Sequence, residues 1–322
     1  MLLLPEGVVP QLVSTEDAIA SVEQTFVAFD RGEAAPYPVV RETLGHRGAV
    51  FGVKSGFDRS AGVLGLKAGG YWPENAAAGL TNHQSTVLLF DPDTGKPIAL
   101  VGGNYLTGVR TGAASAIATR HLARRDARVL GLIGAGVQSA HQIRAALAVR
   151  PLATVVAWDP SAANLAELGR IVLSLGVDYR AAGSAEEAVR AADILTTVTP
   201  ATRPIVMKDW VRPGTHINAM GADTRGKQEL AAELVAASRV IVDDTAQAIT
   251  IGECQHAYAQ GMLRTDAMTT LGSIAGGRCP GRQSDSEITL FDGTGIALQD
   301  LAPAATAVRR ARERGLGVEV PF

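Results

Sequence analysis

Three basic residues within the first 110 positions stand in unusual surroundings. Arg41 follows the apolar pair Val39-Val40, Lys67 ends an apolar run and precedes glycines, and Arg110 lies among small residues at a predicted helix start. Each alone could be a surface cation. Together they suit one task, because arginine can bind both oxygens of a carboxylate at once and lysine adds a compact charge. We therefore expect Arg41, Lys67 and Arg110 to clamp the carboxylate of a small acid.

A second chemical signal is a glycine-rich turn. The apolar run 129–133 leads directly into it, and a helical pattern begins at once. Gly134 allows a tight turn, and Gly136 lets the backbone approach a pyrophosphate at the helix N-terminus, where free N–H groups favour anions. Ser139 replaces a third glycine and is small enough for close helix–strand packing. The residues expected to contact a dinucleotide here are Gly134, Ala135, Gly136, Val137, Gln138 and Ser139.

Asp159 indicates which dinucleotide is bound. It ends the next predicted strand, 154–158, 25 residues after Gly134. An acid at that strand end hydrogen-bonds the adenosine ribose hydroxyls. No lysine or arginine follows in 160–164, so a 2′-phosphate would meet a carboxylate without a cation. The sequence therefore predicts NAD and not NADP.

The elements around the clamp predict a helix and a mainly antiparallel sheet. Ser14 or Thr15 can cap a helix over 14–32, and a second helix is expected from 107 to 124. The segment 90–97, which is rich in Asp, Pro and Gly, reads as a turn between two strands. The short β-rich runs are expected at 49–53, 63–67, 86–90 and 98–101.

After residue 124 strands and helices alternate, which implies a parallel sheet with crossover helices and an α/β, Rossmann-type fold. The helix after Gly136 should bury Val137, Ala140, Ile143 and Leu147. A C-terminal helix is expected over 304–314, just after Pro303. Two domains follow: 1–115 with 302–322, and 116–301. The strands are expected at 129–133, 154–158, 177–180, 194–198, 216–219 and 240–242.

The composition excludes several classes of function. The formal net charge is −2, and the densest basic cluster, 120–128, reads as a solvated helix end, so nucleic-acid binding gains no support. Two cysteines need no disulfide framework and fit a reducing compartment, which we take to be the cytoplasm. Residues 1–13 lack a basic segment and a cleavage site, and no run approaches the ~20 apolar residues of a membrane span. We assign no metal ligand.

Four motifs follow one another along the chain: Gly65-Leu66-Lys67, Leu106-Thr107-x-x-Arg110-Thr111-x-Ala113-Ala114-Ser115, Gly134-Ala135-Gly136-x-Gln138 and Gly221-Ala222-Asp223-x-x-Gly226-Lys227-x-Glu229-Leu230. With these motifs in this order, the whole chain resembles the ornithine cyclodeaminase/mu-crystallin family. The resemblance implies that Arg41, Lys67 and Arg110 hold the substrate carboxylate, and that Asp223 faces the α-nitrogen across the nicotinamide. It also implies a homodimer built through the N-terminal domain, which would then serve substrate binding and dimerisation.

The same resemblance extends the expected cofactor contacts to Thr111, Thr199, Met220, Gly221, Asp223 and Gly293. Several stretches, among them 68–75, 82–86, 251–256 and 290–300, are most similar to the branch of the family that reduces iminosuccinate to L-aspartate with NADH. Lys54 and His83 could hold the second carboxylate of such a substrate. Either Lys67, if burial depresses its pKa, or Asp223 could deliver the proton.

Other activities stay open. An ornithine cyclodeaminase would recycle its NAD within one turnover, and an alanine dehydrogenase or a cyclic-imine reductase would use the same clamp. A cofactor-binding protein with little activity is a further alternative, although an intact set of Arg41, Lys67, Arg110 and Asp223 argues against it. The expected function is reduction of a small 2-imino acid to the L-amino acid by an NAD-dependent oxidoreductase.

Overall fold

The computed structural model describes all 322 residues, and they form two compact units. Unit 1 comprises residues 1–110 and 296–322, and unit 2 comprises residues 111–295. The borders expected from the sequence, after 115 and before 302, lie five and six residues further along the chain. The first border falls inside a continuous helix, α2 (Asn104–Leu122), where no break in the sequence pattern marks it. The units are described in turn.

Unit 1 is one sheet with helices on one face. Its strand order is β18-β1-β7-β6-β5-β4-β2, with β3 also paired to β4. β3 to β7 run antiparallel, as the sequence predicts, and each of the four predicted strands is longer than expected. The strands are β1 (Leu2–Leu4), β2 (Ala34–Pro36), β3 (Val40–Thr43), β4 (Val50–Asp58), β5 (Val63–Tyr71), β6 (His83–Phe90), β7 (Pro97–Gly102) and β18 (Val318–Glu319).

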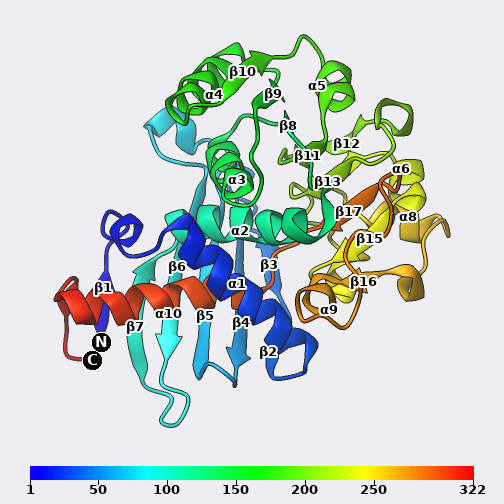
Figure 1. Cartoon of the computed structure of the whole chain (residues 1–322). Coiled ribbons are helices and arrows are strands. Elements are labelled where there is room, and N and C mark those ends of the chain that lie inside the picture. The colour runs from blue at the N-terminus through cyan, green and yellow to red at the C-terminus, as the bar shows by residue number, and fades with distance from the viewer. The chain divides into compact units, whose positions relative to one another are not determined.

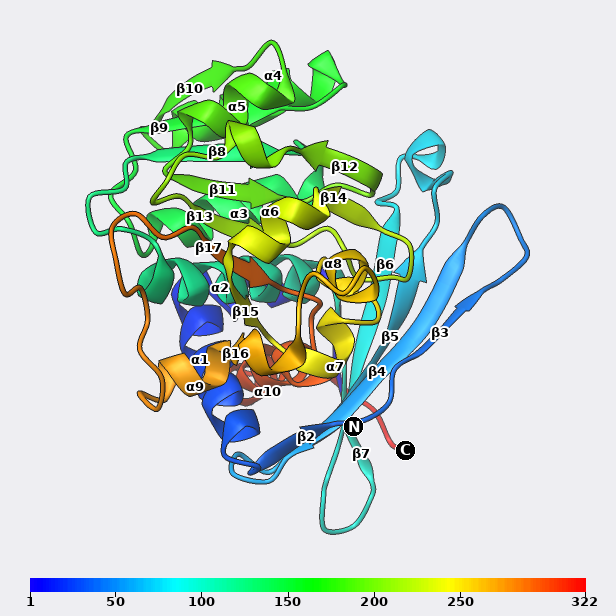
Figure 2. The same cartoon turned by 90° about the vertical axis from the view of Figure 1, so that its right-hand side faces the viewer.

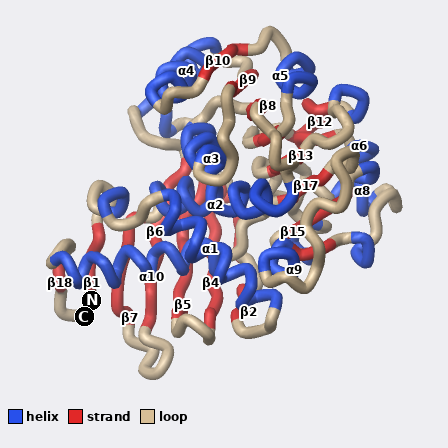
Figure 3. The backbone as a smooth tube through the Cα atoms, viewed as in Figure 1, coloured by secondary structure: helices blue, strands red, loops and turns tan.

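Two helices cover this sheet, α1 (Thr15–Asp30) and α10 (Ala297–Arg314). α10 crosses β4, β5 and β6, and α1 packs beside it (Figures 1 and 3). Ser14 is the N-cap of α1, in a reciprocal capping box with Asp17, which confirms the predicted helix start. Short 3-10 helices occur at Val9–Gln11 and Asn75–Ala78.

The start of α10 differs from the prediction. The helix begins at Ala297 and contains Pro303, whereas proline was expected to precede it. Packing explains the difference: Leu298 and Leu301 press against glycines of β4 and β5, where an added Cβ would come within about 3 Å of either leucine. Burying these two leucines offsets the backbone hydrogen bond that a proline removes.

Unit 2 is a parallel, doubly wound sheet. Its strand order is β10-β9-β8-β11-β13-β17-β15-β16, and every pairing in it is parallel (Figure 2). β12 and β14 form a separate parallel pair. The strands are β8 (Val129–Ile133), β9 (Thr154–Trp158), β10 (Asp178–Ala181), β11 (Ile194–Thr197), β12 (Thr202–Val206), β13 (His216–Ala219), β14 (Gln228–Leu230), β15 (Arg239–Val242), β16 (Thr269–Thr270) and β17 (Thr289–Asp292).

The predicted α/β alternation is confirmed in unit 2. β8, β9 and β13 have the predicted bounds, β11 and β15 differ by one residue at one end, and β10 is shifted by one residue at both ends. β17 was missed, because its four residues carry no alternation and lead into a run of small residues. Besides α2, the helices are α3 (Val137–Leu147), α4 (Ala162–Ser174), α5 (Ala185–Ala191), α6 (Ala232–Ala237), α7 (Thr245–Ala248), α8 (Gln255–Ala259) and α9 (Leu271–Ala275), with 3-10 turns at Lys208–Trp210 and Thr265–Ala267.

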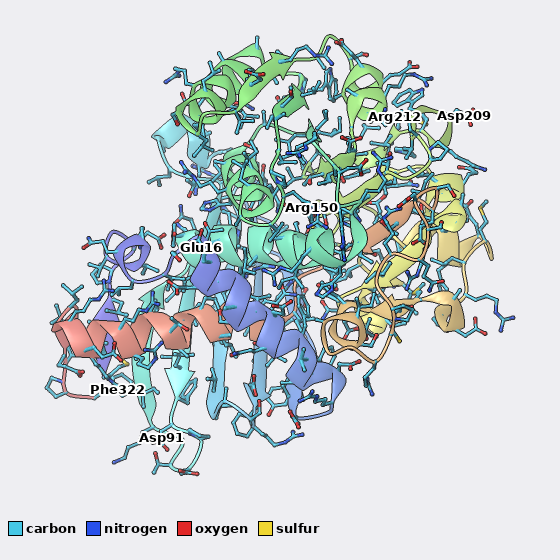
Figure 4. All side chains as sticks on the ribbon, viewed as in Figure 1. Glu16, Asp91, Arg150, Asp209, Arg212 and Phe322 are labelled. Carbon is cyan, nitrogen blue, oxygen red and sulfur yellow. The ribbon has the colours of Figure 1, made fainter.

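The basic cluster at 120–128 serves structure. Arg150, labelled in Figure 4, donates to the carbonyls of Arg120, Ala123 and Arg124 at the end of α2. Arg124 pairs with Asp193 at 2.9 Å. These cations compensate the negative end of the helix. None of the helices combines the length and apolar character that crossing a bilayer requires.

Candidate active site

The glycine-rich turn of unit 2 contains two glycines with different tasks. Gly134 has φ +98°, and a Cβ there would lie 2.9 Å from both Thr199 Cγ2 and the Val198 carbonyl oxygen, so no other residue fits. Gly136 is the N-cap of α3, and a Cβ added to it would have no other atom within 4 Å. The first glycine closes the turn, and the second leaves the N-terminus of the helix open to an anion.

The first turn of α3 corrects one expectation. Ser139 is buried, as predicted, and its hydroxyl donates to the Gly136 carbonyl at 2.6 Å. Val137 was expected on the buried face but is 69% exposed, because the buried face consists of Ser139, Gln142, Ile143, Ala145 and Ala146. Val137 therefore lies on the open side of the turn, where it is accessible to a cofactor.

Asp159 lies directly against the glycine-rich turn. Its Oδ2 accepts the Ala135 N–H at 2.7 Å, and its Oδ1 accepts the Ser161 N–H at 2.8 Å. The carboxylate thus joins the end of β9 to the turn after β8. This is the place where an acid meets the adenosine ribose in a dinucleotide fold.

The other predicted cofactor residues of unit 2 gather at the carboxyl ends of β11, β13 and β17. Thr199, Met220 with Gly221, and Gly293 follow these three adjacent strands. A Cβ on Gly293 would lie 2.5 Å from the methyl carbon of Met220, and one on Gly221 would lie 2.4 Å from the Thr199 carbonyl oxygen. Ligands of parallel sheets bind at this edge. Thr111 belongs to α2 and is nearly buried.

One residue that the prediction missed holds these loops together. The buried Glu229 carboxylate accepts the Thr197 hydroxyl at 2.7 Å, the Thr199 N–H at 2.6 Å and the Gly221 N–H at 2.9 Å. Burial raises the pKa of Glu229, and these three donors counteract the rise. Glu229 therefore fixes the loops after β11 and β13 relative to each other. Its place in the motif Gly226-Lys227-x-Glu229 was the available signal.

Asp223 follows β13, and the sequence prediction named no partner for it. It is paired with Lys227, whose ammonium lies 2.7 Å from Asp223 Oδ1 and also donates to the Gly221 carbonyl at 3.1 Å. The Thr224 hydroxyl donates to the same carboxylate oxygen at 3.1 Å. Asp223 keeps 32% of its side chain exposed, so the carboxylate is partly accessible.

In unit 1, Lys67 and Arg110 meet at a carboxylate that the prediction did not include. Asp300, from the first turn of α10, is fully buried and lies 2.8 Å from Lys67 Nζ and 2.9 Å from Arg110 Nε. Gln299 accepts a further bond from Arg110 Nη1 at 3.2 Å. Asp300 therefore positions Lys67 and Arg110, two of the three cations of the expected clamp.

The electrostatics of this cluster favour binding of an anion. Burial lowers the pKa of Lys67 to about 7, with contributions from Arg110 and Lys54, while Asp300 opposes the change. The same three cations outweigh the burial of Asp300 and lower the pKa of its carboxyl. One carboxylate thus faces three cations, and an excess of positive charge remains.

Strand register brings the other predicted substrate residues to the same face of the sheet. Lys54 is directly opposite Lys67 across β4 and β5. Arg41 on β3 is opposite Gly52 on β4. Gly52 is in turn opposite Gly69 on β5, and Gly69 is opposite Ser85 on β6. Positions two apart on a strand share a face, so Arg41 and His83 lie on the side of Lys67. Four of the five predicted substrate residues of unit 1 therefore share one face of the sheet, and Arg110 on α2 is joined to Lys67 through Asp300.

The glycine-rich turn for a dinucleotide and the buried cation cluster are typical of an NAD-dependent oxidoreductase. Comparison with known proteins gives the same class. The chain belongs to the ornithine cyclodeaminase/mu-crystallin family, whose model matches residues 1–315.

Among individual proteins, the iminosuccinate reductase of Paracoccus denitrificans is 48% identical over 320 residues, which are 99% of each chain. Its crystal structure in complex with NAD⁺ aligns with a TM-score of 0.94, at 47% identity over 100% of this chain and 99% of that one.

Two further solved structures are similar over their full lengths. The Δ1-pyrroline-2-carboxylate reductase of Thermococcus litoralis, in complex with NADH and L-proline, has a TM-score of 0.96 and 33% identity, with 99% of this chain and 100% of that chain covered. An archaeal alanine dehydrogenase dimer with bound NAD has a TM-score of 0.95 and 34% identity, with 100% and 99% covered.

Proposed function

We propose that this protein reduces iminosuccinate to L-aspartate with NADH. The observation that carries the proposal is the buried cation cluster of unit 1, in which Lys67 and Arg110 share Asp300 and Lys54 stands opposite Lys67. Such an excess of positive charge suits a substrate with two carboxylates. The 48% identical reductase supports the same substrate.

Arg41, Lys67 and Arg110 are assigned to the α-carboxylate. Asp300 accepts a hydrogen bond from Arg110 Nε, and Gln299 accepts one from Nη1. The guanidinium is therefore held in one orientation before the substrate binds. A carboxylate bound by fixed cations leaves the α-carbon little freedom. Orientation of this kind lowers a barrier by several kcal/mol, of the ~7–11 kcal/mol available to ideal alignment.

The cofactor is assigned to unit 2. Gly134 to Ser139 would hold the pyrophosphate and Asp159 the adenosine ribose, while Thr111, Thr199, Met220, Gly221 and Gly293 would surround the nicotinamide half. NADH, when bound, supplies the hydride. Asp223 is assigned to the α-nitrogen, where its charge stabilises a protonated iminium, a far better hydride acceptor than a neutral imine. Lys67 is assigned the delivery of the proton.

Lys54 and His83 are assigned to the distal carboxylate, and this assignment separates the substrate classes. Ornithine carries a distal ammonium, which needs an acid. Asp300, the carboxylate bound within the cluster, is fully buried and engaged by Lys67 and Arg110. Lys54→Met should raise the KM for iminosuccinate about tenfold and leave the KM for a monocarboxylic imine within about twofold. An equal change for both substrates would contradict the assignment.

One set of assays tests the function. NADH oxidation is followed with iminosuccinate generated in place, with pyruvate plus ammonia and with cyclic imines, and proline is sought from ornithine. Iminosuccinate should give the highest kcat/KM. Ammonia release from ornithine without net NADH change would identify a cyclodeaminase instead, and silence in every assay would favour a binding protein.

The sheet face of unit 1 opposite to the clamp supports a homodimer. Val40, Phe51 and Leu100 are exposed there, and Leu66 and Leu88 are half-buried. An apolar sheet face of this kind marks an interaction surface. Size-exclusion chromatography with light scattering should give twice the mass of 33.5 kDa, and Leu100→Asp should shift the protein towards monomer.

A further inference from the structure

We propose that a hydrogen-bonded path through Thr107 and Ser85 to His83 returns a proton to Lys67 after each turnover; this rests on the proposed function, in which Lys67 gives up a proton. The path lies entirely within unit 1. It joins a nearly buried ammonium to a half-exposed imidazole.

The three contacts of the path are continuous. Lys67 Nζ donates to Thr107 Oγ1 at 3.4 Å, Thr107 Oγ1 and Ser85 Oγ are 3.3 Å apart, and Ser85 Oγ is 3.2 Å from His83 Nε2. A hydroxyl both donates and accepts, so each can pass a proton on by rotating. Contacts of this length tighten when a catalytic complex forms.

The other groups around Lys67 do not provide such a route. Asp300 on α10 is fully buried and bonded to both cations, and Arg110 on α2 keeps its proton at neutral pH. Lys54 on β4 is nearly buried as well. Burial lowers the pKa of Lys67 to about 7, so the neutral amine that remains after proton transfer needs a donor of similar acidity. An imidazole, with an ordinary pKa of about 6.5, is such a donor.

The proton balance is simple. Lys67 starts as an ammonium and transfers one proton to the imine nitrogen of the substrate, which leaves a lone pair on Nζ. Thr107 then donates its hydroxyl proton to Nζ and accepts one from Ser85, which accepts one from Nε2 of the His83 imidazolium. His83 ends neutral and takes a proton from solvent. The distal carboxylate assigned to His83 favours the imidazolium, because a neighbouring negative charge stabilises the protonated ring.

A burst experiment tests the path. Enzyme loaded with NADH is mixed with iminosuccinate, and the first turnover and the steady-state rate are recorded separately. Mixing is done at about pH 6, below the lowered pKa of Lys67, so that in Ser85→Ala Lys67 begins protonated and the first turnover should stay within about twofold of wild type. Later turnovers should slow at least about tenfold, the low end for a lost proton-transfer partner. The matched control is Ser21→Ala, a half-buried serine of unit 1 whose hydroxyl bonds only its own helix.

A second pair of variants tests the neighbouring hydroxyl. Thr107→Val should likewise give a normal first turnover followed by slow later turnovers. Thr107→Ser, which keeps the hydroxyl, should restore most of the steady-state rate. Thr25→Val, at a buried threonine of α1, is the control for this pair. NADH affinity and the unfolding temperature verify that each variant is folded.

Two results would overturn the path. One is a steady-state rate in Ser85→Ala or Thr107→Val equal to that of the controls. The other is an equal slowing of first and later turnovers, which would mean that the hydroxyls only position Lys67. Failure of the proposed function is distinguishable, because it would abolish the first turnover in the wild-type enzyme.

Discussion

The proposed cofactor side of unit 2 and the proposed substrate side of unit 1 are built from different chemical groups. The cofactor side of unit 2 is built from backbone: glycines at turns, an open helix N-terminus, and acids such as Asp159 and Glu229 that bond N–H groups. The substrate side of unit 1 is built from charged side chains, with Lys67 and Arg110 joined through a buried Asp300. The arrangement in unit 2 depends on the path of the backbone. The arrangement in unit 1 depends on the balance between positive and negative side chains.

This difference predicts unequal tolerance to substitution. Backbone donors survive changes of neighbouring side chains, so single changes in unit 2 should weaken binding gradually. A buried ion cluster is different, because removal of one partner leaves an uncompensated charge that costs about 3–5 kcal/mol. Substitutions in the clamp should therefore have the largest effects on the enzyme.

The most damaging change is expected at Arg110. Arg110→Ala removes a carboxylate ligand and one partner of Asp300, so kcat/KM should fall about a thousandfold, or ~4 kcal/mol, through a raised KM and a lowered kcat. Arg110→Lys keeps the charge but not the fork of donors and should recover only part of the loss. Steady-state kinetics measure both, and full activity in Arg110→Lys would show that geometry is unimportant.

Asp223 should show the next largest effect and sharpen the contrast within unit 2. Asp223→Asn removes the charge that stabilises the iminium, so kcat should fall about a hundredfold while the Kd for NADH changes less than about threefold. Exposed Asp209→Asn provides the control. Wild-type turnover in Asp223→Asn would remove this residue from the mechanism.

The charge balance of unit 1 also predicts a pH dependence. The pKa of Lys67 is lowered from 10.5 to about 7, so the ammonium is present below pH 7 and is lost as the pH rises through that value. Reduction needs the protonated form, so kcat should decline above pH 7 by about tenfold per unit. In Lys67→Arg, activity is lower but this decline should vanish. A flat wild-type profile between pH 6 and 9 would exclude Lys67 as the acid.

The smallest effect is expected at the cofactor side. Asp159→Ala removes the acid assigned to the adenosine ribose, so the Kd for NADH should rise about fivefold, or ~1 kcal/mol, while binding of NADPH improves. Titration with both cofactors measures the change. Tighter binding of NADPH than NADH by the wild-type protein would reverse the predicted preference.

Local patterns predicted much of this molecule. The alternation of apolar runs and turns correctly predicted the bounds of β8, β9 and β13. The glycine spacing correctly predicted the turn at 134–136. The gathering of Arg41, Lys54, Lys67 and His83 follows from strand register, which confirms that these residues share a face. Their functional roles stay predictions.

What the sequence did not predict depends on distant partners. Asp300 bonds Arg110 from 190 residues away, and Glu229 bonds Thr197 from 32 residues away, so neither pairing leaves a local trace. The ion pair of Lys227 with Asp223 is local, at four residues, but lies in a loop where helical spacing rules do not apply. The exposure of Val137 and the early start of α10 depend likewise on tertiary packing.

Hydride transfer to the α-carbon is the central chemical claim, and isotope labelling tests it directly. NADH carrying deuterium at the transferable position of C4 is incubated with iminosuccinate and the enzyme, and the product is analysed by NMR. The account predicts L-aspartate with one deuterium on the α-carbon, formed in proportion to the NADH consumed. Unlabelled aspartate, or NADH that stays unoxidised, would contradict it.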